Sequence, residues 1–400
     1  MYVTRPRSLY RNFPGALSVQ PQPDAPFSGN LVLSDEDSES IGSFCCGIWR
    51  NHRINTLPFP SDRILEVFHS SLHEEAAIVR KIWFVPVLDK PLSSNRYYAI
   101  KAKGTRKGEA YTCSKEGEVG MCCFSNPGMD PKTRPFDHRD RYQQFEIRPY
   151  QGGGFFAQSV EWDGYPPSFL RRGGWEVQES HSFKLRLSEA RGLQDSTKSD
   201  FSELNFPLHS KRSTPVVLGK WHCPFVFVKE ERKKIFRADD QMKESFVYEL
   251  SLKQWWEQIH YAEKNDDSNR DNVVVVDARV KRLFCLVNGV DGERDHERRD
   301  GDSGFVWFKV KKEDCKMRRR VVSVGLSCGL FEKMRWMQER RGWFDNREID
   351  VRVSGNKEKH GWRKFGCYVL VESFVLRRMD GSLLINFNFR NTDMIECKWE

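Results

Sequence analysis

The residues of this chain that could perform chemistry are scattered along the sequence. Two pairs of neighbouring cysteines, Cys45-Cys46 and Cys122-Cys123, come nearest to a metal site. Neighbouring side chains on a strand point to opposite faces, so one such pair rarely chelates an ion unaided. A four-thiolate zinc site would need both pairs to meet in space, and the sequence leaves open whether they do. We therefore predict no metal-binding and no cofactor-binding residues.

Two other patterns resemble catalytic segments. Asp300–Gly304 contains the GDSG sequence seen around serine nucleophiles, but the stretch is rich in charge and Gly, which is typical of a solvated loop. His222 stands beside Cys223, yet adjacent side chains on a strand diverge, and we expect His222 to be exposed opposite a buried Trp221. The sequence thus predicts no catalytic residues.

Composition limits the compartment and the partners. The 400 residues carry 65 Lys and Arg against 56 Asp and Glu, a net charge of +9 that is interleaved along the chain. This pattern favours a mildly basic surface and argues against a nucleic-acid partner. The 11 Cys include several inside apolar runs, which indicates small buried side chains in a reducing compartment. No apolar stretch approaches the roughly 18 residues of a membrane-spanning helix.

The spacing of apolar residues predicts a mainly β protein of the α+β class. Strand patterns such as Arg63–His69 and Arg96–Lys101 recur, with turn residues between them. We expect antiparallel sheets in one or two packed β-rich lobes, with two or more amphipathic helices. The predicted organisation is an irregular N-terminal leader over 1–30, an N-terminal β-rich lobe over 31–190, a polar connection over 191–214 and a C-terminal β-rich lobe over 215–400.

Two helices are predicted in the C-terminal lobe. Apolar residues recur at i, i+3, i+4 and i+7 near 252–263, and a similar stripe runs over 326–341. Trp255 and Trp256, with His260 close by, resemble a stacking surface for sugars or bases. Aromatic residues at helical spacing are more often core, so we expect both indoles to be buried.

The clearest pattern lies near the C-terminus. Cys367–Leu376 and Leu383–Phe389 flank Met379–Ser382, whose Asp-Gly pair allows positive φ at both turn positions and predicts a tight hairpin. Alternation would place one face of the second strand in the core and leave the other mostly wet. The residues expected on the wetter face are Leu384, Asn386, Asn388 and Arg390.

Segments along nearly the whole chain resemble a plant-specific family of uncharacterised proteins, the domain of unknown function 1262 family. That resemblance implies a plant source, and it implies no activity, cofactor or site residue. The segments that carry it are Met1–Pro6, Leu88–Lys101, Lys107–Glu116, Asp163–Val177, Ser213–Glu230, Leu252–Ile259, Gly366–Ile385 and Cys397–Glu400.

These observations favour a non-enzymatic binding or protein-interaction module in the cytoplasm or nucleus, with a protein or a small molecule as its partner. One alternative is a hydrolase or transferase whose dispersed site, drawn from His222, Cys223, His260 and carboxylates, is assembled only by the fold. Another is association with nucleic acid or anionic membrane through basic surface. The oligomeric state is not encoded in any pattern that we find.

Overall fold

The structure is a computed structural model that describes residues 1–19, 26–39, 43–44, 49–50, 53–69, 79–115, 133–185, 187–193, 205–231, 238–264, 272–298, 304–310, 323–343 and 350–400. It is mostly β, with several antiparallel sheets and a few helices, which confirms the predicted fold class. Within the described ranges no helix is both long and apolar enough to cross a membrane.

The chain forms two compact units. The first consists of the described parts of Met1–Ala190 and Phe236–Phe246, together with Pro224–Lys229; helix α5 (Ala238–Glu244) belongs to it. The second consists of the described part of Arg191–Cys223, of Glu230 and Glu231, and of the described part of Val247–Glu400. The predicted lobe over 215–400 is therefore not one uninterrupted stretch, because part of it packs with the first unit.

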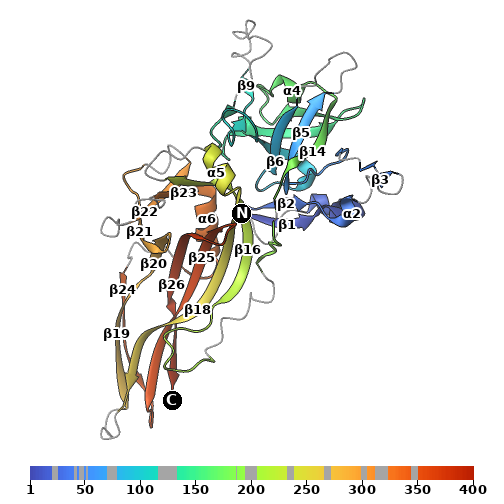
Figure 1. Ribbon diagram of the computed structural model, residues 1–400. Helices are drawn as coiled ribbons and strands as arrows, with labels where there is room; N and C mark the ends of the chain where they lie inside the picture. The colour runs from blue at the N-terminus through green and yellow to red at the C-terminus, as the bar shows by residue number, and fades with distance from the viewer. Residues whose placement is uncertain are drawn as a thin grey trace. The chain divides into compact units, whose positions relative to one another are not determined.

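The first unit is built from short strands, with short helices and 3₁₀ turns between some of them (Figure 1). The strands are β1 (Tyr2–Pro6), β2 (Gly29–Leu33), β3 (Ser43–Phe44), β4 (Trp49–Arg50), β5 (Arg63–His69), β6 (Arg80–Pro86), β7 (Arg96–Lys101), β8 (Ala110–Tyr111), β9 (Ser114–Lys115), β10 (Thr133–Arg134), β11 (Gln144–Pro149), β12 (Phe155–Ser159), β13 (Gly164–Tyr165) and β14 (Trp175–Lys184). Besides α5, the helices are α1 (Arg7–Asn12), α2 (Glu36–Glu39) and α4 (Ser168–Arg171), with 3₁₀ turns η1 (Pro14–Ser18), η3 (Leu92–Ser94), η5 (Arg141–Gln143) and η7 (Phe225–Phe227).

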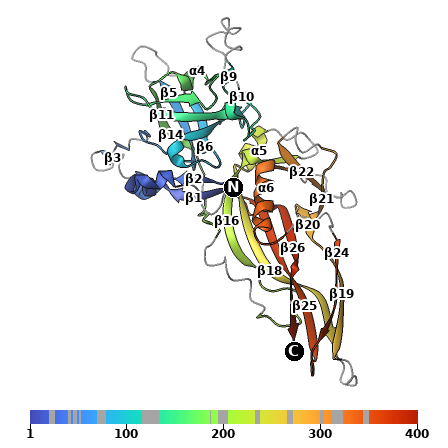
Figure 2. The ribbon, with the colours of Figure 1, turned by 180° about the vertical axis from the view of Figure 1, so that it is seen from behind.

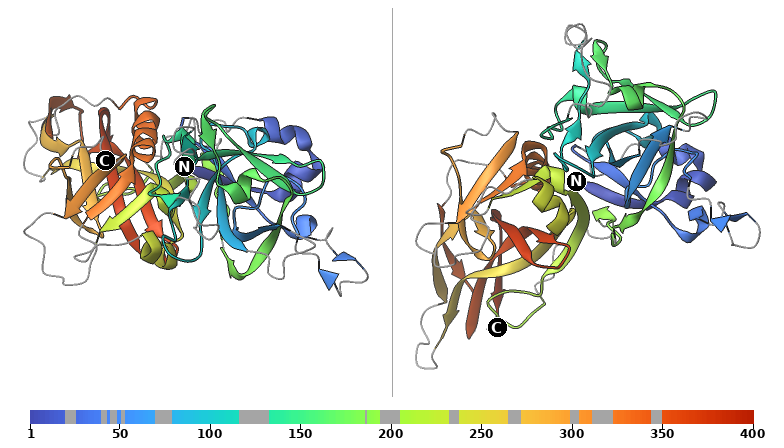
Figure 3. Two further views of the ribbon diagram at one scale, coloured as in Figure 1. Left: turned by 90° about the horizontal axis from the view of Figure 1, so that it is seen from above. Right: turned by 45° about the horizontal axis from the view of Figure 1, so that its top comes forward.

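Six strands of the first unit form a closed ring. Strand β6 pairs with both β5 and β7, and the order continues through β11, β12 and β14 back to β5. The blue-to-green strands in Figure 3 curve around one another in this way. Alternate side chains of each strand point inward and form one apolar cluster that includes Phe84, Tyr97, Phe145, Phe155 and Trp175.

The N-terminal residues are part of this unit, so the predicted irregular leader over 1–30 is wrong. Strand β1 pairs in parallel with β2, with Tyr2 opposite Gly29. The ring of Tyr2 is fully buried, and its hydroxyl donates to the carbonyl of Pro86 at 2.7 Å. Proline and polar residues made this stretch look irregular, whereas a few buried side chains are enough to order its described residues, 1–19 and 26–30.

The second unit is built on one large, mainly antiparallel sheet. Its strands lie in the order β23 (Ser323–Ser327), β22 (Phe305–Val310), β21 (Val290–Arg294), β20 (Leu283–Val287), β26 (Leu383–Trp399), β25 (Lys364–Arg378), β18 (Val247–Glu263) and β16 (Val216–Pro224). β15 (Gly192–Leu193) also pairs with β16, and a separate ribbon joins β19 (Val273–Lys281) to β24 (Asp350–Glu358). Glu230 and Glu231, the last residues of β17 (Val228–Glu231), and α6 (Cys328–Glu339) complete the second unit.

Strand β18 occupies the segment for which a helix was predicted near 252–263, so that prediction is wrong. The strand pairs with β25 from Tyr248 opposite Arg378 to Glu263 opposite Lys364. A central strand that is covered on both faces carries apolar residues on both, and this run can imitate helical spacing. Trp255 and Trp256 are both buried, as expected, but they lie on opposite faces of a strand.

The C-terminal hairpin is confirmed, with a different turn. Strands β25 and β26 pair antiparallel over almost their whole length. Of the two central turn residues only Gly381 has a positive φ, of 83°. The carboxylate of Asp380 instead accepts the N–H of Ser382 at 2.8 Å, and Gly381 donates to the carbonyl of Arg378, which gives a longer loop than the predicted one.

Helix α6 lies over one face of this sheet (Figure 2) and corresponds to the helix expected over 326–341. It begins after Ser327, whose hydroxyl accepts the N–H of Leu330. Phe331 packs against Phe308 and Phe387 of the sheet. The expected wetter face of β26 is not wet, because Leu384 and Asn388 are both at least nine-tenths buried.

We predict that Gly381→Ala lowers the free energy of unfolding by about 1–2 kcal/mol, because a side chain is strained at positive φ. Gly355→Ala is the matched control: a Cβ meets nothing within 4 Å at either position, and Gly355 lies in a strand without positive φ. Urea unfolding of both variants measures the difference. Equal free energies of unfolding would contradict the assigned turn.

Candidate functional site

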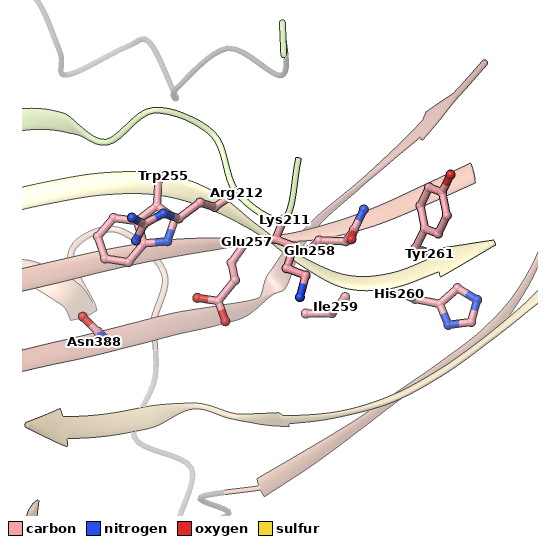
Figure 4. A pocket seen from close by; sticks show the side chains of 9 residues that line it. All are labelled: Lys211, Arg212, Trp255, Glu257, Gln258, Ile259, His260, Tyr261 and Asn388. Carbon is pink, nitrogen blue, oxygen red and sulfur yellow. The ribbon is translucent and has the colours of Figure 1, made fainter. Parts of the chain in front are cut away.

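A groove in the second unit is the candidate site. It has a volume of about 590 Å³ and runs beside strand β18. Figure 4 shows Trp255 and Arg212 at one end of the view, His260 and Tyr261 at the other, and Glu257 between them. The lining residues are Lys211, Arg212, Trp255, Glu257, Gln258, Ile259, His260, Tyr261 and Asn388.

One wall comes from a segment that follows the edge of β18. The N–H of Ser213 donates to the carbonyl of Trp256 at 2.9 Å, and the N–H of Gln258 donates to the carbonyl of Lys211 at 2.8 Å. The hydroxyl of Ser213 also accepts the N–H of Trp256. These backbone contacts fix Lys211 and Arg212 at the rim of the groove.

The floor comes from alternate residues of β18 and from β26. Trp255 packs on Val369 and Val371 of β25, with Ile259 beside them. Asn388 lies opposite Ser373, which is opposite Lys253, so Asn388 shares a sheet face with Trp255. The floor is therefore rigid sheet, and only the rim is loop.

Among the described residues, two polar atoms of the floor are buried and have no hydrogen-bond partner. They are Nε1 of Trp255 and Oδ1 of Asn388, and each residue is only 8% exposed. A buried polar atom left unpaired costs about 1–3 kcal/mol. Both residues line the groove, and each of these atoms has almost no exposed surface of its own, so a solute or water reaches it only when a neighbouring side chain shifts. One atom donates and the other accepts.

The charge of the groove is positive. Glu257 is neutralised by Arg390, whose Nη2 and Nε lie 2.9 and 3.1 Å from its Oε1. Arg390 is held in turn by the carbonyl of Lys281 at 3.2 Å. Lys211 and Arg212 are exposed and form no ion pair with any carboxylate in the described part of the chain. Two cations are thus left for an anion from solution.

The groove offers little for covalent chemistry. None of its lining residues is Ser, Thr or Cys. Desolvation and the hydrogen bond to Glu263 raise the pKa of Tyr261 above its ordinary value, so the phenol stays protonated. Within the described ranges, no three His, Cys, Asp or Glu side chains form a metal-binding group. The arrangement is suited to binding a polar solute.

The suspected catalytic residues do not converge. His222 and Cys223 are both buried on β16, at 0% and 1% exposure, and neither lines the groove that His260 borders. The expectation that His222 is exposed is wrong, because β16 is covered on both faces. Cys45-Cys46, Cys122-Cys123 and Asp300–Ser303 lie outside the described residues.

Sequence analysis missed most of the residues that form the groove. Lys211 and Arg212 belong to the stretch taken as a polar connection, and Asn388 was expected on a wet face. The alternation of Trp255, Glu257 and Ile259 was present in the sequence as a strand pattern, and the helical spacing of the same stretch concealed it.

One family model matches part of the chain. Residues 24–124 match the family model described as “Protein of unknown function (DUF1262)”. This supports the predicted resemblance over the matched residues, while a plant source stays a prediction. No curated protein matches the chain.

Among solved structures, 12 chains match. One is described as “Crystal structure of Cry35Ab1”: it is 10% identical, the alignment covers 85% of this chain and 90% of that one, and the TM-score is 0.48.

We predict that Cys223 is inert in the native protein. Burial raises the pKa of its thiol to about 11, so roughly one part in a thousand is thiolate at pH 8. Iodoacetamide at pH 8 should leave Cys223 unmodified before unfolding and modify it after, as read by peptide mass. Alkylation of Cys223 in the folded protein would restore it as a candidate nucleophile.

Proposed function

We propose that this chain is a non-enzymatic binding module that holds a small organic carboxylate in the groove beside β18. The observation that carries the proposal is the pair of buried, unpartnered polar atoms, Nε1 of Trp255 and Oδ1 of Asn388, on the floor of one positively charged groove. A small molecule suits the site better than a protein, because about 590 Å³ lies within the roughly 300–1,000 Å³ of ligand pockets.

The chemistry of the lining describes the ligand. Lys211 and Arg212 at the rim attract a negative charge and can bind a carboxylate. The indole N–H of Trp255 donates to a ligand oxygen, and the amide oxygen of Asn388 requires a ligand donor such as a hydroxyl. The apolar surfaces of Trp255 and Ile259 cover the carbon skeleton. A hydroxycarboxylate combines these features.

The surrounding residues keep the groove ready for such a ligand. Because Arg390 neutralises Glu257, the carboxylate at the centre of the groove repels an anion less than a lone charge would. Backbone ladders hold both floor residues in place, so little side-chain ordering opposes binding.

We also propose an intracellular setting in a plant cell. The family resemblance supports a plant source. The cysteines of the described residues are not in disulfides, which supports a reducing compartment.

Binding of citrate, malate, succinate and glucose to the purified full chain, followed by isothermal titration calorimetry, tests the proposed function. Citrate or malate should bind, succinate more weakly because it lacks a hydroxyl, and neutral glucose least. Added salt should weaken binding, because the rim cations are exposed. The proposal fails if none of the acids binds, or if glucose binds as tightly as citrate.

Trp255→Phe should weaken citrate binding about tenfold, since it removes one buried donor worth roughly 1–1.5 kcal/mol while keeping an aromatic ring. Trp362→Phe is the matched control. Its Nε1 is also unpartnered and the residue is also 8% exposed, but it lies outside the groove. Equal losses in the two variants would contradict the assigned donor.

The double variant Lys211→Ala/Arg212→Ala should weaken citrate binding about tenfold or more and flatten its dependence on salt. Arg279→Ala/Lys359→Ala removes the same two residue types from exposed positions that do not line the groove. That control should bind citrate as the unmodified chain does. If both double variants lose the same affinity, the attraction arises from net charge and not from the rim.

A further inference from the structure

Two cysteines face each other across the C-terminal hairpin. Cys367 on β25 lies directly opposite Cys397 on β26, and both are free thiols. Directly opposed residues of an antiparallel pair have Cα atoms about 4.5–5.5 Å apart, and a disulfide needs about 4.4–6.8 Å. The ranges overlap, so a bridge can form without separating the strands.

The two thiols differ in access to solvent. Cys367 is 1% exposed and belongs to an apolar cluster with Val274, Val276 and Phe365. Cys397 is partly exposed at the edge of the same cluster. An oxidant from solution therefore reaches Cys397 first, and Cys367 is placed to react with the product.

The two thiols also differ in pKa. The hydrogen bond from Cys367, with Lys357 nearby, lowers the pKa of Cys397 to about 7, although partial burial opposes the shift. The same hydrogen bond and burial raise the pKa of Cys367. Near neutral pH, Cys397 supplies the reactive thiolate while Cys367 keeps its proton.

We propose that Cys367 and Cys397 are a reversible oxidation site, a dithiol that hydroperoxides convert into a disulfide across β25 and β26. This inference does not depend on the proposed carboxylate ligand. It rests on the register of two strands and on the unequal burial of two thiols.

The chemistry balances with hydrogen peroxide as the oxidant. The Cys397 thiolate attacks one peroxide oxygen, the O–O bond breaks, and the hydroxide that leaves takes up a proton to form water. Cys397 is then a sulfenic acid. The Cys367 sulfur attacks the Cys397 sulfur, the S–O bond breaks, and the departing hydroxide takes the Cys367 proton. Two thiols and one peroxide give one disulfide and two waters.

The two cysteines lie beside the groove, near the end of the ladder away from the hairpin turn. Cys367 is also opposite His260 of β18, a residue that lines the groove. A bridge would tie β25 to β26 there and restrict the unfolded chain, which stabilises the hairpin. A disulfide made by peroxide and removed by thiols is typical of intracellular redox sensing.

The test uses the reduced full chain, treated with a slight molar excess of hydrogen peroxide, blocked with N-ethylmaleimide and digested with trypsin. We expect a tryptic peptide with Cys367 linked to one with Cys397, a loss of two hydrogen atoms in the intact mass, and reversal by dithiothreitol. The proposal is overturned if peroxide converts Cys397 to sulfinic acid while Cys367 remains a thiol, which the N-ethylmaleimide label on Cys367 would show. Linkage of either residue to another cysteine overturns it as well.

Two variants test the order in which the two thiols react. In Cys397→Ser, Cys367 should remain a thiol at peroxide doses that fully oxidise the unmodified chain, because its only route to oxidation is lost. Cys223→Ser removes another buried thiol of the same unit and should leave the Cys367–Cys397 linkage unchanged. Oxidation of Cys367 at an unchanged rate in Cys397→Ser would contradict the assigned order of reaction.

Discussion

The antiparallel ladder formed by β18, β25 and β26 is the constraint on which the second unit depends. Its hydrogen bonds set which residues stand opposite one another from Tyr248 to Glu263 and along both arms of the hairpin. A slip by one residue would turn every side chain to the other face. One buried contact reinforces this register: Arg378 binds Glu230, 2% exposed, with Nη2 2.6 Å from Oε2, and Tyr248 donates to the same carboxylate. Truncating one partner of such a pair typically costs about 3–5 kcal/mol.

The ladder separates two kinds of surface. On one face, aromatic residues such as Phe387 pack beneath α6, and Glu372 binds Arg341 and Gln254. On the other face, the same strands hold two polar atoms that no described residue satisfies, Nε1 of Trp255 and Oδ1 of Asn388. A fold that served only stability would gain from apolar residues at both positions. The retained polar atoms are consistent with a face kept for a ligand.

The spacing of apolar residues predicted the features that depend on local pattern. These are a mainly β fold, the C-terminal hairpin and a helix where α6 lies. The prediction failed where burial on both faces removed the alternation. β18 looked helical because Trp255 and Trp256 are apolar neighbours on opposite faces, and β26 looked half wet because Asn388 is polar yet covered. The groove could not be predicted, since it joins Lys211 to Asn388 through pairings that no local pattern encodes. The opposition of Cys367 and Cys397 likewise follows only from the register of a long hairpin.

The indole N–H of Trp255 reports most directly on the central claim, that the groove floor keeps a buried donor for a bound solute. A ¹H–¹⁵N spectrum of the full chain, with the Trp255 signal assigned from Trp255→Phe, contains its own controls. The indoles of Trp83 and Trp175 already donate to the carbonyls of Ser61 and Leu170, both at 2.8 Å. Titration with citrate should move the Trp255 signal and leave those two in place. A Trp255 signal that stays fixed while calorimetry detects bound citrate would contradict the account.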